Sequence, residues 1–214
     1  VNYLQRVSFL PHHRRTSVAL PGHKPCAAEV LSFEEVVAGK ASALLDRAVP
    51  RDLFDLFWLA RTAQPWDRAT CRRLMIVFAA TSIHDPRDLS PAAAIDRFRE
   101  VDFTALHQVI RQADRPSLAE MAVAVEPLLV EFLTFNESEH AFLDALAEGE
   151  LKPELLFPDR PDLAEKAAMH PGLQWKTLNV RQFRQRQRRE RNPGTPSSSL
   201  TNSANTTCAS SPLP

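Results

Sequence analysis

Lys40 carries a positive charge within a segment whose apolar residues follow the spacing of one helix face. Between Ser32 and Ala48, apolar side chains recur every three or four residues, and Lys40 falls near the middle of that stripe. The apolar members of the stripe are Phe33, Val36, Val37, Ala41, Leu44 and Leu45. A buried ammonium group is costly unless a carboxylate or a phosphate compensates its charge, and such groups concentrate at functional sites. The sequence therefore predicts that Lys40 faces a negatively charged group.

The segment that follows supplies two carboxylates. Asp52 and Asp55 are three residues apart, which places them on neighbouring positions of one helix surface. A short connection before Pro50 allows an antiparallel arrangement that brings both acids toward Lys40. A lysine beside two carboxylates suits phosphoryl or nucleotidyl transfer, in which acids hold Mg²⁺ and the lysine neutralises phosphate charge. The same residues could also form a purely structural salt bridge between packed helices, and the spacing leaves both interpretations open.

Other catalytic and metal-binding patterns are missing from the sequence. The seven histidines form no HExxH arrangement, the three cysteines form no CxxC pair, and neither a GxSxG elbow nor a P-loop occurs. We therefore predict no metal site of the histidine or cysteine type. An odd number of separate cysteines also fits a reducing compartment.

Helical patterns dominate from Ser32 onward. Ser32 with Glu35 and Ser117 with Glu120 have the spacing of capping boxes, and Pro50 is typical of the first turn of a helix. The expected helices span residues 32–48, 50–62, 67–80, 90–100, 102–112, 118–135, 136–149 and 162–169. Short apolar runs between turn formers predict extended segments at 1–4, 7–10 and 18–20. The predicted fold class is mainly α: a helical bundle with short N-terminal strands.

Composition predicts four segments along the chain. Residues 1–31 form the strand segment, 32–176 a helical domain and 177–191 a basic tail helix. Residues 192–214 carry no charge and consist mostly of Ser, Thr, Asn, Ala and Pro, so we expect a disordered tail.

Charge and hydropathy restrict the partners. The 26 basic and 26 acidic residues cancel, so contact with a nucleic acid must come from a local patch. The longest apolar run, residues 74–80, is far shorter than the roughly 20 residues that span a membrane. No export signal is found, and we expect a cytoplasmic protein without membrane contact.

The sequences of two segments resemble those of one protein family. Ala38-Gly39-Lys40 follows a capped helix start, and Arg51-Asp52-Leu53-Phe54-Asp55-Leu56 follows about ten residues later. The two segments are similar to the "A-x-K" and "R-D-h-h-D-h" helices of the AbiEii/AbiGii toxin family of nucleotidyltransferases. The C-terminal region of that family is also similar to one further segment, His170-Pro171-Gly172-Leu173-Gln174-Trp175-Lys176. The resemblance covers roughly residues 1 to 180.

The resemblance assigns roles to individual residues. It implies that Lys40 and Asp55 are catalytic and that Arg51 and Asp52 bind substrate. The family also carries a Gly-Ser motif and an Asp-x-Asp pair that bind nucleotide phosphates and Mg²⁺, and this sequence contains neither. Residues 1–31 then resemble a residual strand segment of the nucleotidyltransferase core. We accordingly expect the chain to be the C-terminal half of a nucleotidyltransferase-type α/β fold, with the first half upstream of Val1.

The function implied by the resemblance is that of a toxin in a toxin–antitoxin or phage-defence system. Such a toxin transfers nucleotides from an NTP to an RNA acceptor, with tRNA as the candidate acceptor and Mg²⁺ as the cofactor of the active enzyme. A cognate antitoxin is the expected partner. The arginines that could contact the tRNA backbone are Arg181, Arg184, Arg188, Arg189 and Arg191. The alternatives are a non-catalytic helical remnant or interaction module and, for the arginines, a solvated tail helix.

Overall fold

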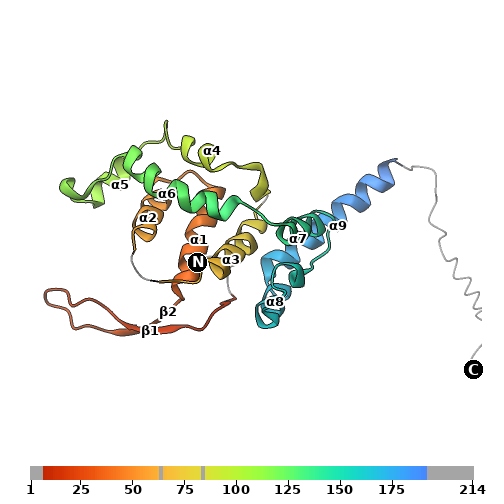
Figure 1. Ribbon diagram of the computed structural model, residues 1–214, viewed down its shortest axis with the longest axis horizontal. Helices are drawn as coiled ribbons and strands as arrows, with labels where there is room; N and C mark the ends of the chain where they lie inside the picture. Colours follow the sequence, from red (N-terminus) through yellow and green to blue (C-terminus); the bar gives the residue numbers. More distant parts are fainter. Residues whose placement is uncertain (1–6, 63–64, 83–84, 192–214) are drawn as a thin grey trace, which may run out of the picture.

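The protein is mainly helical, as the sequence predicts (Figure 1). A computed structural model describes residues 7–62, 65–82 and 85–191. The expected strand at residues 1–4 and the expected disordered tail at 192–214 lie outside the described residues. The α-helices are α1 (Phe33–Asp46), α2 (Pro50–Ala60), α3 (Arg68–Ala80), α4 (Pro91–Asp96), α5 (Thr104–Val109), α6 (Leu118–Leu133), α7 (Glu137–Ala147), α8 (Pro161–Ala168) and α9 (Pro171–Arg191). The 3₁₀ turns are Pro86–Asp88, Gln112–Asp114 and Pro153–Leu155, and the strands are β1 (His13–Thr16) and β2 (Ala27–Val30).

Local sequence signals account for the helix starts. At the start of α1 the Ser32 hydroxyl accepts a hydrogen bond from the amide of Glu35. Pro50 is the first residue of α2. The predicted capping box of Ser117 and Glu120 is confirmed at the start of α6. Helices α4 and α5 are each six residues long, shorter than the sequence pattern predicts.

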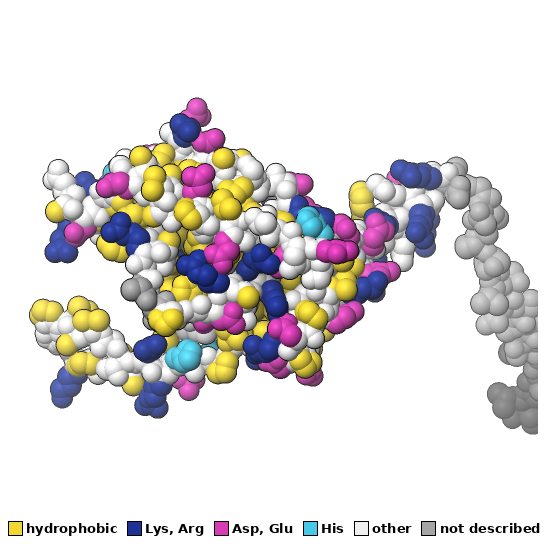
Figure 2. Space-filling model, viewed as in Figure 1, with side chains coloured by type: hydrophobic (Ala, Val, Ile, Leu, Met, Phe, Trp, Pro, Cys, Tyr) yellow, Lys and Arg dark blue, Asp and Glu magenta, His cyan; other side chains and the backbone are white. Residues whose placement is uncertain are grey.

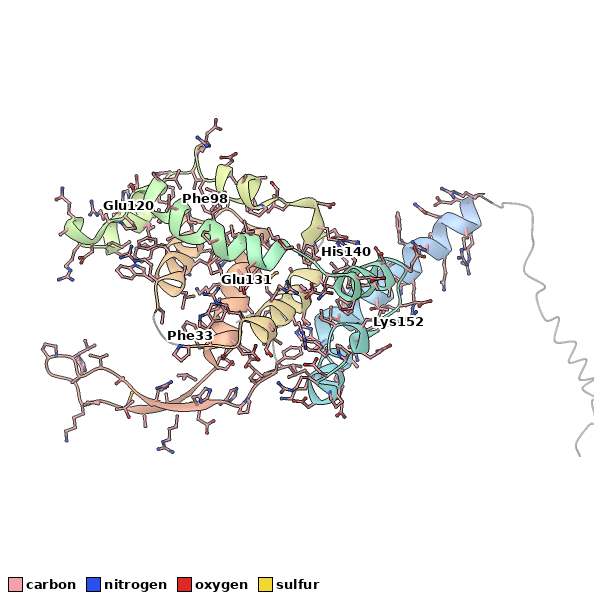
Figure 3. The ribbon with its side chains drawn as sticks, in the orientation of Figure 1. Phe33, Phe98, Glu120, Glu131, His140 and Lys152 are labelled. Atoms are coloured by element: carbon pink, nitrogen blue, oxygen red, sulfur yellow. The ribbon has the colours of Figure 1, made fainter. Side chains whose placement is uncertain are left out.

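The core forms where α1 packs along α3, with α2 and α6 beside them. The buried face of α1 carries Val37, Ala38, Ala41 and Leu44, all with no exposed surface. Helix α6 crosses above α1 and α2, and Phe98, which closely follows α4, is buried as well (Figures 1 and 3). Because apolar side chains on several helices share this one cluster, α1 and α2 are held as a fixed pair.

Ion pairs join α3 to α7 and to the segment just before α8. Arg72 on α3 donates to Glu139 at 2.8 Å, and Arg73 donates to Asp159 at 2.5 Å. The predicted end of α8 near Met169 is confirmed, but Pro171 at once begins α9, which runs without a break to Arg191. The expected boundary after residue 176 therefore falls inside one helix.

The N-terminal segment of the described chain is held by side chains and not by a sheet. Residues 7–10, expected to be extended, form no strand, because the carboxylate of Glu35 accepts the amides of Phe9 at 2.8 Å and Leu10 at 3.2 Å. Lys166 donates to the carbonyl of Phe9 at 2.6 Å. The strands of the structure are instead β1 and β2, an antiparallel hairpin that extends from the body beneath α1 (Figure 1).

Candidate functional site

Lys40 and Asp55 form an ion pair between α1 and α2. The Lys40 Nζ lies 2.5 Å from Asp55 Oδ2, and the two side chains are 35% and 30% exposed. The antiparallel arrangement that the sequence predicts thus brings the lysine to one of its two candidate acids. Because both side chains keep contact with solvent, a ligand can reach this pair.

The position of Lys40 on its helix differs from the expectation. The sequence places it near the middle of the apolar stripe, whereas the buried face of α1 is centred on Ala38 and Ala41. At 100° per residue, Lys40 lies at the edge of that face, next to Leu44. Partial exposure spares the ammonium group most of the desolvation cost, so the pair with Asp55 suffices to compensate its charge.

Asp52 has a different partner from the one expected. Its side chain is 1% exposed, and it accepts the Nε of Arg47 at 2.8 Å and the Nη2 of Arg47 at 3.3 Å. The carboxylate of Asp52 raises the pKa of the Arg47 guanidinium, first through this hydrogen bond and then through its charge. Asp52 therefore positions Arg47. Arg51 is exposed, and it is not among the residues that line the cleft beside Lys40.

A cleft of about 620 Å³ opens beside Lys40. Helix α1 supplies Lys40, Arg47 lies directly after the last residue of that helix, and the facing wall comes from the end of α3 and from the N-terminal segment. Other residues that line it include Ser8, His12, Leu31, Ser42, Thr81 and Ser82. Two cationic side chains with hydroxyl groups around them form a suitable surface for a phosphate group.

The carboxylates around this cleft are already engaged. The oxygens of Glu35 accept the backbone amides of residues 9 and 10, those of Asp52 accept Arg47, and Asp46 Oδ1 accepts the Ser82 hydroxyl at 2.5 Å. Within 7–62, 65–82 and 85–191, no group of three or more His, Cys, Asp or Glu side chains is placed to hold a metal ion. The described acids of this cleft are thus bonded to the protein's own amide, guanidinium and hydroxyl groups.

Sequence reasoning assigned no role to Arg47. Arg47 follows the last residue of α1 in an extended conformation, so helix periodicity does not connect it to Lys40, and only the packed structure brings it to the cleft. His12 and Thr81 also line the cleft, but they come from distant parts of the chain and no spacing rule connects them to Lys40.

The basic half of α9 lies apart from the cleft and extends beyond the body of the molecule (Figures 1 and 2). Two of its arginines bind the end of α7: Arg181 Nε donates to the carbonyl of Gly149 at 2.6 Å, and Arg184 pairs with Glu148. Gly149 has a φ of +81°, and a Cβ there would come within 2.8 Å of Arg181 Cγ, so glycine permits this close approach. Arg188, Arg189 and Arg191 are exposed, and they remain candidates for contact with RNA.

No helix in the described part of the chain combines the length and the apolar character needed to cross a membrane.

Comparison with known proteins gives one family. A family model described as "Nucleotidyl transferase AbiEii toxin, Type IV TA system" matches residues 3–157, which include Lys40, Arg47, Asp52 and Asp55. No curated protein and no solved structure matches the chain.

Proposed function

The chain belongs to the AbiEii nucleotidyl transferase toxin family of type IV toxin–antitoxin systems, and from this premise we propose that it transfers nucleotides from an NTP to an RNA acceptor, with tRNA as that acceptor. The observation that carries the proposal is the partly exposed Lys40–Asp55 pair at 2.5 Å beside a cleft that also holds Arg47. A type IV system implies an antitoxin as partner. We further propose a role in phage defence and a cytoplasmic location.

In this proposal the triphosphate enters the cleft and draws Lys40 away from Asp55. A phosphate with several negative oxygens competes well for an ammonium group that only one carboxylate holds. Arg47, which Asp52 keeps in place, faces the same cleft and adds a second positive charge. The two cations then stabilise the charge that develops on the phosphates during transfer.

Asp55 gains a free carboxylate when Lys40 moves to the phosphates. It can then accept a hydrogen bond from the hydroxyl group of the acceptor RNA and orient that oxygen toward the α-phosphorus. The hydroxyl gives its proton to the Asp55 carboxylate as its oxygen forms the new P–O bond, the bond to the β-phosphate breaks, and pyrophosphate leaves with the electron pair. Lys40 and Asp55 are the catalytic residues in this scheme, Asp52 is a positioning residue, and Arg51 is proposed to contact the acceptor from the exposed surface of α2.

A divalent metal ion would neutralise charge on the transferring phosphates and on the leaving pyrophosphate. Because no group of three or more acidic, histidine or cysteine side chains in the described residues is placed to hold a metal ion, we assign no step of the scheme to that ion.

The direct experiment measures transfer of label from each α-labelled NTP to tRNA in the presence of Mg²⁺. Lys40→Met and Asp55→Asn should each lower the rate by about 10² to 10³, as does the removal of one group that stabilises transition-state charge. Arg68→Met is the matched control, because Arg68 also forms an interhelical ion pair, at 2.6 Å from Glu131, with both side chains partly exposed (Glu131 is labelled in Figure 3). Equal losses in all three variants would mean that the effect is a general one on stability.

A second candidate function is a non-catalytic interaction module. It is favoured by two ion pairs that could serve the fold alone: Lys40–Asp55 joins α1 to α2, and Arg47–Asp52 joins the residue after α1 to α2. If the intact chain transfers no label and binds no NTP, while Lys40→Met and Asp55→Asn only lower its melting temperature, this function replaces the first.

A further inference from the structure

The hairpin of β1 and β2 is an arm that buries none of its side chains. Every residue from 11 to 31 is exposed, and the eight strand residues are exposed on both faces of the ribbon. A two-stranded hairpin without a buried face is at best marginally stable by itself. Packing therefore does not account for the sequence of this arm, and its exposed side chains are available to contact a partner.

The charge of the arm is mainly positive. The arm contains three permanently charged basic residues, Arg14, Arg15 and Lys24, and one acidic residue, Glu29. Figure 2 shows basic side chains projecting from the outer edge of the arm, away from the helical body. A local basic patch is therefore present in a chain whose overall charge is zero.

The strand register divides this charge between two faces. Arg14 lies opposite Glu29 on one face, and His12 on that same face approaches Glu29 to 3.9 Å. On the other face Arg15 lies opposite Ala28, and His13 lies opposite Val30. This second face has a permanent positive charge and no acid from either strand, as a surface that follows a phosphate backbone requires.

The base of the arm joins the cleft of Lys40. His12 and Leu31, one from each end of the hairpin, line the cleft together with Lys40. Just before the arm, Glu35 and Lys166 bind the backbone of Phe9, and just after it Ser32 caps α1. Both ends of the arm are thus attached to the helical body at the edge of the cleft.

We propose that residues 11–31 form an RNA-binding arm that holds the backbone of the acceptor next to its reacting end and directs that end into the Lys40 cleft. This inference rests on the proposed function for the identity of the acceptor, and it adds the surface on which the acceptor lies. RNA is favoured over a protein strand because charge is the dominant property of the strand faces, and because the arm leads to a cleft with two phosphate-binding cations. Arg15 and Arg14 bind phosphates from the two opposite faces of the ribbon, and Lys24 binds further from the cleft.

Binding is measured separately from transfer, by fluorescence anisotropy of labelled tRNA over a series of salt concentrations. The double variant Arg14→Gln/Arg15→Gln should raise the Kd about tenfold near 0.1 M salt and reduce the slope of log K against log salt by roughly 1 to 1.5, since each contact with a single strand contributes about 0.7. The control Arg99→Gln/Arg111→Gln removes the same charge from two exposed arginines, which pair with Asp96 and Asp114 elsewhere on the surface. It should change the slope by much less.

Three outcomes decide the matter. If the arm variant and the control weaken RNA binding equally, the arm is not an RNA site, and the proposal is overturned even when label transfer persists. The proposal is also overturned if the arm variant leaves RNA binding intact and the amides of β1 or β2 gain protection from hydrogen exchange when the antitoxin is added, because the arm then pairs with a protein strand. If the intact chain binds RNA through the arm but transfers no label, the arm is supported and the proposed function fails.

Discussion

The ion pair Lys40–Asp55 and the ion pair Arg72–Glu139 both join two helices, but they differ in what surrounds them. Glu139 is 2% exposed, and besides Arg72 it accepts the amide of Asn136 at the start of α7. Lys40 and Asp55 are both partly exposed, and Lys40 borders a cleft. The first pair completes a helix cap and a helix contact, whereas the second is open to a ligand.

A charge pair between helices can thus serve either the fold or a reaction, and burial and other hydrogen bonds distinguish the two. Loss of one member of a buried pair leaves a charge without compensation, which destabilises the fold. Loss of one member of a partly exposed pair leaves a charge that water can solvate, so the fold changes little.

The largest effect is expected from Glu139→Ala. The substitution removes the partner of Arg72 and the Glu139 half of the capping box of α7, and it should lower the free energy of unfolding by about 3 kcal/mol. Urea unfolding at pH 7 measures the loss. Glu137→Ala, in the same first turn but exposed, should cost less than about 0.5 kcal/mol. Similar losses in both variants would contradict the assignment of Glu139 to the fold.

A smaller, pH-dependent effect is expected at His170, a buried group outside both pairs. Its ring packs against the rings of Phe9 and Phe78, and burial lowers its pKa below the usual 6.5. Above pH 6.5 the ring is neutral in both states; as the pH falls below 6.5 the unfolded chain binds the proton first, so stability declines until the lowered pKa is passed. His170→Phe should therefore show a shallower loss of melting temperature between pH 6.5 and pH 5 than the natural chain.

His140→Gln serves as the control for this pH dependence, because His140 is exposed. Its melting temperature should follow the same pH course as that of the natural chain. If the melting temperatures of the natural chain and of His170→Phe fall equally between pH 6.5 and pH 5, His170 does not contribute to the pH dependence of stability.

The smallest effect on stability is expected from Lys40→Met, in the partly exposed ion pair. The substitution removes the charge from a pair that is partly exposed, so the free energy of unfolding should change by less than about 1 kcal/mol. Affinity for NTP, measured by calorimetry, should fall at the same time. A loss of stability as large as that of Glu139→Ala would place the Lys40 pair with the fold.

The helices could be predicted in large part because their signals are local. Ser117 with Glu120 specifies the start of α6, and Pro50 specifies that of α2, through contacts within three or four residues. The strands could not be placed in this way. Residues 7–10 look extended, yet their amides are taken by Glu35, a residue about 25 positions away that the sequence marks only as part of a cap.

The candidate site was predicted in part for the same reason. The charge of Lys40 among apolar residues and the spacing of Asp52 and Asp55 indicated which residues to consider. Spacing could not decide which acid faces which base, because three-residue separation places both acids on one surface. The packing of α1 on α2 pairs Asp55 with Lys40 and the buried Asp52 with Arg47.

Local sequence signals specify the helical character of the chain, the starts of its main helices and the charged residues that need partners. The position of Lys40 at the edge of the core beside a cleft, and the approach of a basic hairpin to that cleft, arise only when the helices pack. The physical reason is the range of the interactions. Caps and helix faces depend on neighbours along the chain, whereas ion pairs between helices and the walls of a cleft depend on segments that meet only when the core packs.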